Sequence, residues 1–89
     1  MGKYTITITF EVNFRHGETA YCIFGRNIRE VKVAEVFCNC KYDINGDGAT
    51  DKTLEYKVYD EGMRCYYIIS EFKMFASHED AETYLNNAQ

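Results

Sequence analysis

The chain has 89 residues, 46% of them hydrophobic and 16% aromatic, which suits one small domain spanning 1–89 and excludes a disordered chain. Its net charge of −4 arises in residues 33–89, which hold eleven acidic and five basic side chains, so direct nucleic-acid binding is disfavoured and a basic partner or a cation is favoured. We expect no leader, find no apolar run of the roughly 20 residues that a membrane span needs, and therefore expect a cytoplasmic protein with reduced thiols.

Residues 4–14 alternate strictly between apolar and polar side chains, which predicts a first strand with one buried face. The apolar positions are Tyr4, Ile6, Ile8, Phe10, Val12 and Phe14. An exposed strand edge beside Thr5, Thr7 and Thr9 would allow a sheet-extended homodimer as the alternative to a monomer.

Residues 19–24 read as a short second strand, and the turn at 25–27 leads into a long third strand over 28–42. Within that strand the apolar set changes face. Val31 and Val33 lie on one side, whereas Val36, Cys38, Cys40 and Tyr42 lie on the other. Such a switch predicts a bulge or a bend, as small barrels require.

The Asp- and Gly-rich residues 43–52 predict a loop, followed by a fourth strand over 53–59, a tight turn at Glu61–Gly62 and a fifth strand over 64–75. The register expected for this hairpin places Val58 opposite Cys65, Tyr56 opposite Tyr67 and Leu54 opposite Ile69.

Ser77 is a helix N-cap candidate with Asp80 at the third helical position. An apolar stripe of Ala81, Tyr84, Leu85 and Ala88 would dock the helix on the sheet. The expected class is therefore α+β, mainly β, with about five antiparallel strands in a bent sheet or an SH3-like barrel and one C-terminal helix.

Four cysteines, namely Cys22, Cys38, Cys40 and Cys65, are many for a reduced chain of this length. They can be core thiols, since free cysteine packs well in β cores, or a structural zinc site. The difficulty for zinc is that residues i and i+2 of a strand lie about 6.6 Å apart. A bulge near Asn39 would relieve it.

The segment from Asp43 to Gly48 resembles the start of a calcium loop. The oxygen donors would be Asp43, Asn45, Asp47 and Asp51. Leu54 stands where the loop requires a bidentate Glu, and strands rather than helices flank it. A hairpin loop explains the same residues, so calcium is a less favoured ligand than zinc.

A candidate protein-binding surface lies at the expected hairpin tip, because tyrosine and methionine give amphipathic contact area. Its members are Tyr59, Glu61, Met63, Tyr66 and Tyr67. Ordinary cross-strand packing explains the tyrosines equally well. His16 and His78 have no nucleophile at motif spacing, and we expect no enzymatic activity.

The stretch from Ala20 to Leu85 resembles small SH3-like barrel proteins of phages and mobile elements of Gram-positive bacteria. The resemblance rests on Tyr21, Ile28, Val33 and Val36, on Tyr56-Lys57-Val58, and on the run from Phe72 to Ala81 that joins the last strand to the helix. The extra first strand and the 43–52 loop depart from the pattern.

This resemblance implies a phage or prophage protein that binds and inhibits a host protein with a basic surface, as anti-CRISPR proteins inhibit CRISPR nucleases. The alternatives are a small metal-binding domain without an inhibitory role, and a housekeeping barrel without a dedicated ligand.

Overall fold

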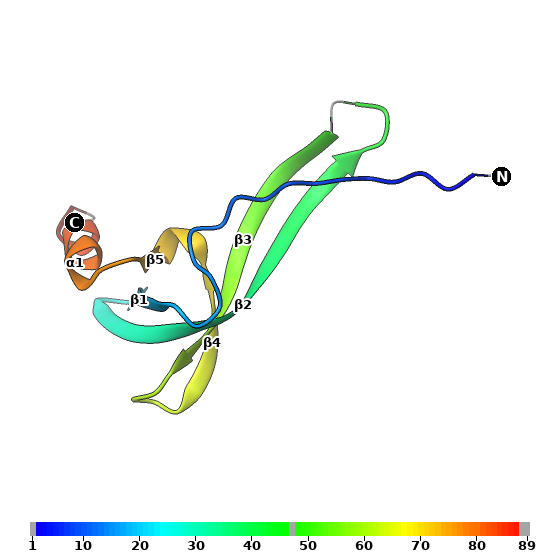
Figure 1. Cartoon of the computed structure of the whole chain (residues 1–89). Helices are drawn as coiled ribbons and strands as arrows, with labels where there is room; N and C mark the ends of the chain where they lie inside the picture. Colours follow the sequence, from blue (N-terminus) through cyan, green and yellow to red (C-terminus); the bar gives the residue numbers. More distant parts are fainter. Residues whose placement is uncertain (1, 47, 88–89) are drawn as a thin grey trace.

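A computed structural model describes residues 2–46 and 48–87, which form one open antiparallel sheet and one helix (Figure 1). The sheet has the order β4-β3-β2-β1-β5. Its elements are β1 (Thr19–Phe24), β2 (Asn27–Asp43), β3 (Gly48–Asp60), β4 (Cys65–Ser70), the 3₁₀ turn η1 (Glu71–Lys73), β5 (Met74–Phe75) and the helix α1 (His78–Asn87). The α+β, mainly β class is confirmed, and of the two forms expected the bent, open sheet is present. Within the described ranges no helix is long and apolar enough to cross a membrane.

The predicted first strand is wrong, because residues 4–14 are outside the sheet. Only the C-terminal end of this segment is fixed by the core. Phe14 is buried, and its ring meets the ring of Tyr56 edge-on at 5.6 Å. Further out, Lys52 Nζ donates to Thr9 O at 2.6 Å. The alternating pattern correctly placed Phe14 inward, but it carries no information about whether a neighbouring strand edge is available.

The face switch in the long strand is confirmed as a bulge at Ala34. Val33 pairs with Val58 and Glu35 with Lys57, so β2 uses two residues where β3 uses one. The extra residue returns Val36 to the same face as Val33. The predicted bounds of 19–24 and 28–42 also agree closely with β1 and β2.

The 43–52 loop is shorter than predicted, because β2 continues to Asp43 and β3 already begins at Gly48. A second irregularity lies within β3, where Asn39 pairs with Thr53 but Lys41 pairs with Thr50. The extra residue is on β3, next to Asp51 with its φ of 54°. The bulge expected near Asn39 is thus on the opposite strand.

The predicted register of the β3–β4 hairpin is wrong by two residues, although the faces are correct. Val58 pairs with Tyr67, Tyr56 with Ile69 and Asp60 with Cys65. The turn occupies four residues, 61–64. The predicted fifth strand is also divided, since η1 separates β4 from β5 and takes the chain to the far edge of the sheet.

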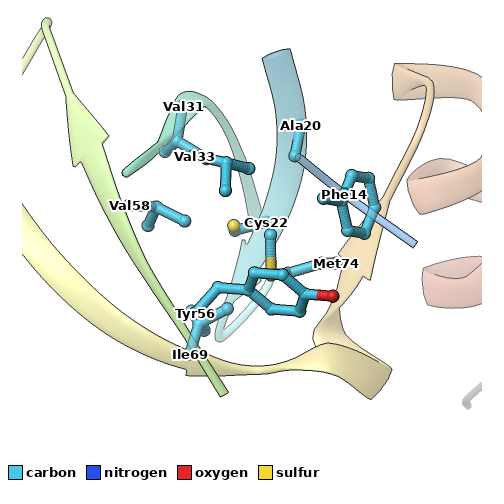
Figure 2. Packing of buried hydrophobic residues seen from close by; sticks show 9 residues of the cluster. All are labelled: Phe14, Ala20, Cys22, Val31, Val33, Tyr56, Val58, Ile69 and Met74. Atoms are coloured by element: carbon cyan, nitrogen blue, oxygen red, sulfur yellow. The ribbon is translucent and has the colours of Figure 1, made fainter. Parts of the chain in front are cut away.

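The core lies inside the bend of the sheet, as Figure 2 shows. Its members are Phe14, Ala20, Cys22, Val31, Val33, Tyr56, Val58, Ile69 and Met74. Ser77 caps α1, with Ser77 Oγ accepting from the Asp80 amide at 3.1 Å. The helix buries Ala81, while Ala88 of the predicted stripe is outside the described residues.

The outer halves of β2 and β3, residues 35–43 and 48–54, project from the core as a two-stranded arm (Figure 1). β1 pairs only with 27–32 of β2, and β4 only with 55–60 of β3. The arm makes the molecule elongated, with extents of 54 × 30 × 17 Å.

Candidate functional site

The four cysteines are spread over the fold. Cys22 is fully buried in the core (Figure 2), Cys38 is exposed, and Cys40 and Cys65 are half-buried. Because the second bulge is on β3, Cys38 and Cys40 keep the regular spacing of one strand. Across 2–46 and 48–87 no three His, Cys, Asp or Glu side chains gather as a metal site. Burial, followed by the charge of Asp60, raises the pKa of Cys22 to about 12, which disfavours the thiolate that zinc requires.

The candidate calcium residues form a hairpin turn at the tip of the arm. The Asn45 amide donates to Asp43 Oδ1 at 2.9 Å, and the Gly46 amide donates to Asp43 O at 3.2 Å. Asp51 belongs to β3, and its carboxylate lies 3.8 Å from Lys41 Nζ. Asp47 is outside the described residues. The Asp43 side chain therefore already stabilises the turn as a hydrogen-bond acceptor.

The candidate protein-binding residues are divided between the two faces of the β3–β4 hairpin. Tyr59 and Tyr66 pair across the strands on the outer face, with ring centroids 4.9 Å apart. Ile68 continues this face, and Lys57 Nζ lies 4.8 Å from the Tyr66 ring centroid. Tyr66 is 57% and Ile68 62% exposed. We call Tyr59, Tyr66 and Ile68 the aromatic face.

Tyr67 points to the other side of the hairpin, where its ring lies 4.7 Å from that of Phe24. It lines an open groove of about 470 Å³. The other lining residues are Phe24, Asn27, Ile28, Arg29 and Met63. Met63 is 59% exposed, and Glu61 is exposed in the turn. The predicted set is therefore one hairpin with two distinct surfaces.

An ion pair with a buried carboxylate, which sequence reasoning missed, fixes the hairpin turn. Asp60 is only 1% exposed, and Arg29 donates to both of its oxygens, Nε to Oδ2 at 2.7 Å and Nη2 to Oδ1 at 2.9 Å. The Met63 amide also donates to Asp60 Oδ1 at 3.1 Å. The Arg29 hydrogen bonds are the main cause that lowers the pKa of Asp60.

Gly62 gives this ion pair its space. A Cβ at position 62 would lie 2.7 Å from Arg29 Nη2 and 3.3 Å from Asp60 Oδ1. The sequence contains a signal for this buried carboxylate. In the alternating run from Leu54 to Asp60, Asp60 falls on the same inward-facing side as Tyr56 and Val58, and a buried carboxylate needs a charged partner. Its partner, 31 residues away, could not be identified from spacing.

No family model, curated protein or solved structure matches this chain.

Proposed function

We propose that this protein is a non-enzymatic phage or prophage protein that binds a host protein and inhibits it, with a CRISPR nuclease as the target. The observation that carries the binding part is the aromatic face. Tyr66 and Ile68 expose more than half of their side-chain surface at the edge of the sheet, where the core does not need them. Inhibition and phage origin rest on the resemblance of the strand-to-helix junction.

The aromatic face has the chemistry of an interface centre. Tyrosine contributes a large apolar area and a hydroxyl at a small cost in conformational entropy, and it is enriched among residues that dominate binding energy. The face is also prearranged, because the ion pair of Arg29 with the buried Asp60 carboxylate fixes the turn between its two strands. A preformed surface loses less entropy on binding.

The charge around the aromatic face is mixed. Lys57 Nζ lies 4.8 Å from the ring centroid of Tyr66, and Glu61 and Arg64 are exposed in the turn between the two strands. Acidic side chains instead stand exposed at Glu79 and Asp80 of α1. The attraction to a basic nuclease therefore derives from the net charge of −4, which accelerates association at low salt.

The test is inhibition of target-DNA cleavage by a panel of purified CRISPR nucleases, with the affinity of each inhibited enzyme measured by calorimetry. Replacing both exposed members of the face, Tyr66→Ala with Ile68→Ala, should weaken binding by at least about tenfold. Ile44→Ala is the matched control, because Ile44 is 83% exposed and lies at the tip of the arm.

Inhibition of none of the nucleases would reject the target class. Binding that is equally strong in the double variant and in the Ile44→Ala control would reject the aromatic face as the contact surface.

A further inference from the structure

In the part of the chain that the structure describes, both the segment 4–10 and the arm lack a neighbouring strand that a stable β-sheet needs. The segment alternates Thr with large apolar residues but has no strand partner among the described residues. Tyr4 is 96% and Ile6 51% exposed. The arm is a ribbon of two strands beyond the reach of β1 and β4. A two-stranded ribbon alone is only marginally stable in water, and a third strand makes it stable.

The two edges of the arm differ in their readiness to accept a strand. The β3 edge carries the bulge at Asp51 and the exposed Lys52, two devices that block edge pairing. The β2 edge beyond Glu35 is regular, without proline, and uncharged from Val36 to Cys40. It is therefore the unprotected edge.

Among the described residues, the segment of the same chain forms no strand pairing with that edge. The Asn13 amide donates to the Tyr56 hydroxyl at 3.3 Å, and Val12 lines a hollow with Val36 of β2. Further out, Thr9 O is bound by Lys52, on the β3 side. The segment thus crosses the face of the arm and leaves the β2 edge free.

We propose that two copies of this chain form a twofold dimer in which residues 4–10 of each copy pair, as an added strand, with the β2 edge 35–43 of the other. Seven extended residues match an edge of nine. The segment 4–10 and the β2 edge 35–43 belong to the same chain. A second copy therefore always supplies the missing strand, whereas a different protein would supply it only when that protein is present. Twofold symmetry forms both pairings at once.

The test combines light scattering with hydrogen exchange on the full chain across a wide concentration range. Thr7→Pro removes an amide in the middle of the added strand and prevents pairing. It has no cost in the monomer, because residue 7 is exposed and outside the sheet. Lys3→Pro, outside the added strand, is the control.

We expect a dimer for the wild type and for Lys3→Pro, and a monomer for Thr7→Pro. Alternate amides of 4–10, those that donate to the β2 edge, should exchange slowly only in the dimers. A wild type that stays monomeric would overturn the proposal, as would a Thr7→Pro dimer. Slow exchange of these amides in a monomer would show pairing within one chain and would overturn it equally.

Discussion

Removing one hydroxyl from the core, with Tyr56→Phe, tests how the segment before β1 is anchored. The Tyr56 hydroxyl donates to Glu71 Oε2 at 2.6 Å and accepts from the Asn13 amide at 3.3 Å. A hydrogen bond to a charged group contributes about 1.5–3 kcal/mol. The Glu71 carboxylate is half-buried and regains water when the partner is lost, so we expect the free energy of unfolding to fall by about 1–2 kcal/mol.

Thermal unfolding followed by circular dichroism measures this loss. For a domain of this size about 1 kcal/mol corresponds to roughly 4–8 °C, so Tm should fall by roughly 4–16 °C. The amide of Asn13 should also exchange faster with solvent. Tyr66→Phe is the matched control, because the Tyr66 ring is exposed and its hydroxyl has no protein partner among the described residues.

Alkaline pH gives an independent measure of the same contact. Burial, followed by the hydrogen bond to Glu71, raises the pKa of Tyr56 from 10.0 to about 12. The neutral phenol is therefore favoured in the fold, and its stabilisation is complete below pH 10 and is lost as the pH rises toward 12. Tyr56→Phe should lack this part of the alkaline loss. If Tyr56→Phe and Tyr66→Phe had equal Tm values and equal alkaline profiles, the anchoring role would be refuted.

Two further predictions concern the ion pair and the cysteines. Asp60→Asn should destabilise the protein at neutral pH and make its stability less dependent on acid pH. The reason is that the lowered pKa of Asp60 adds stability above pH 3.8, which is lost as the pH falls through the pKa of Asp60 in the folded protein. An unchanged acid unfolding transition, followed by fluorescence, would contradict this. A chelator should leave Tm unchanged and elemental analysis should find no bound zinc, because Cys22 is a buried core thiol and no three His, Cys, Asp or Glu side chains gather within the described ranges. Stoichiometric zinc would refute that interpretation.

Local patterns predicted much of this fold. The bounds of β1 and β2, the bulge at Ala34 and the cap at Ser77 all follow from periodicity or from side-chain chemistry within a few residues. The errors concern information that is not local. Residues 4–14 have the pattern of a strand, but the pattern does not show whether the segment aligns with an edge; here its contacts at Asn13 and Thr9 take it across the face of the arm instead.

The candidate site shows the same division. The hairpin was predicted, but its register and the pairing of Tyr59 with Tyr66 were not, because the four-residue turn is held by the ion pair of Asp60 with Arg29, which lies far away in sequence. The metal hypotheses grouped residues by type. Cys22 and Cys38 lie in the core and on the arm, a separation that only the three-dimensional fold reveals.

The projecting arm has a hydrodynamic consequence. The radius of gyration is 16.3 Å, whereas a compact chain of this length would have about 12 Å. The same scaling assigns a radius of 16.3 Å to a compact protein of roughly 190 residues, about twice this chain. On a gel-filtration column calibrated with globular standards, a single copy would therefore elute near the volume of a compact dimer. Elution volume cannot count the copies, and only a mass measured by scattered light can.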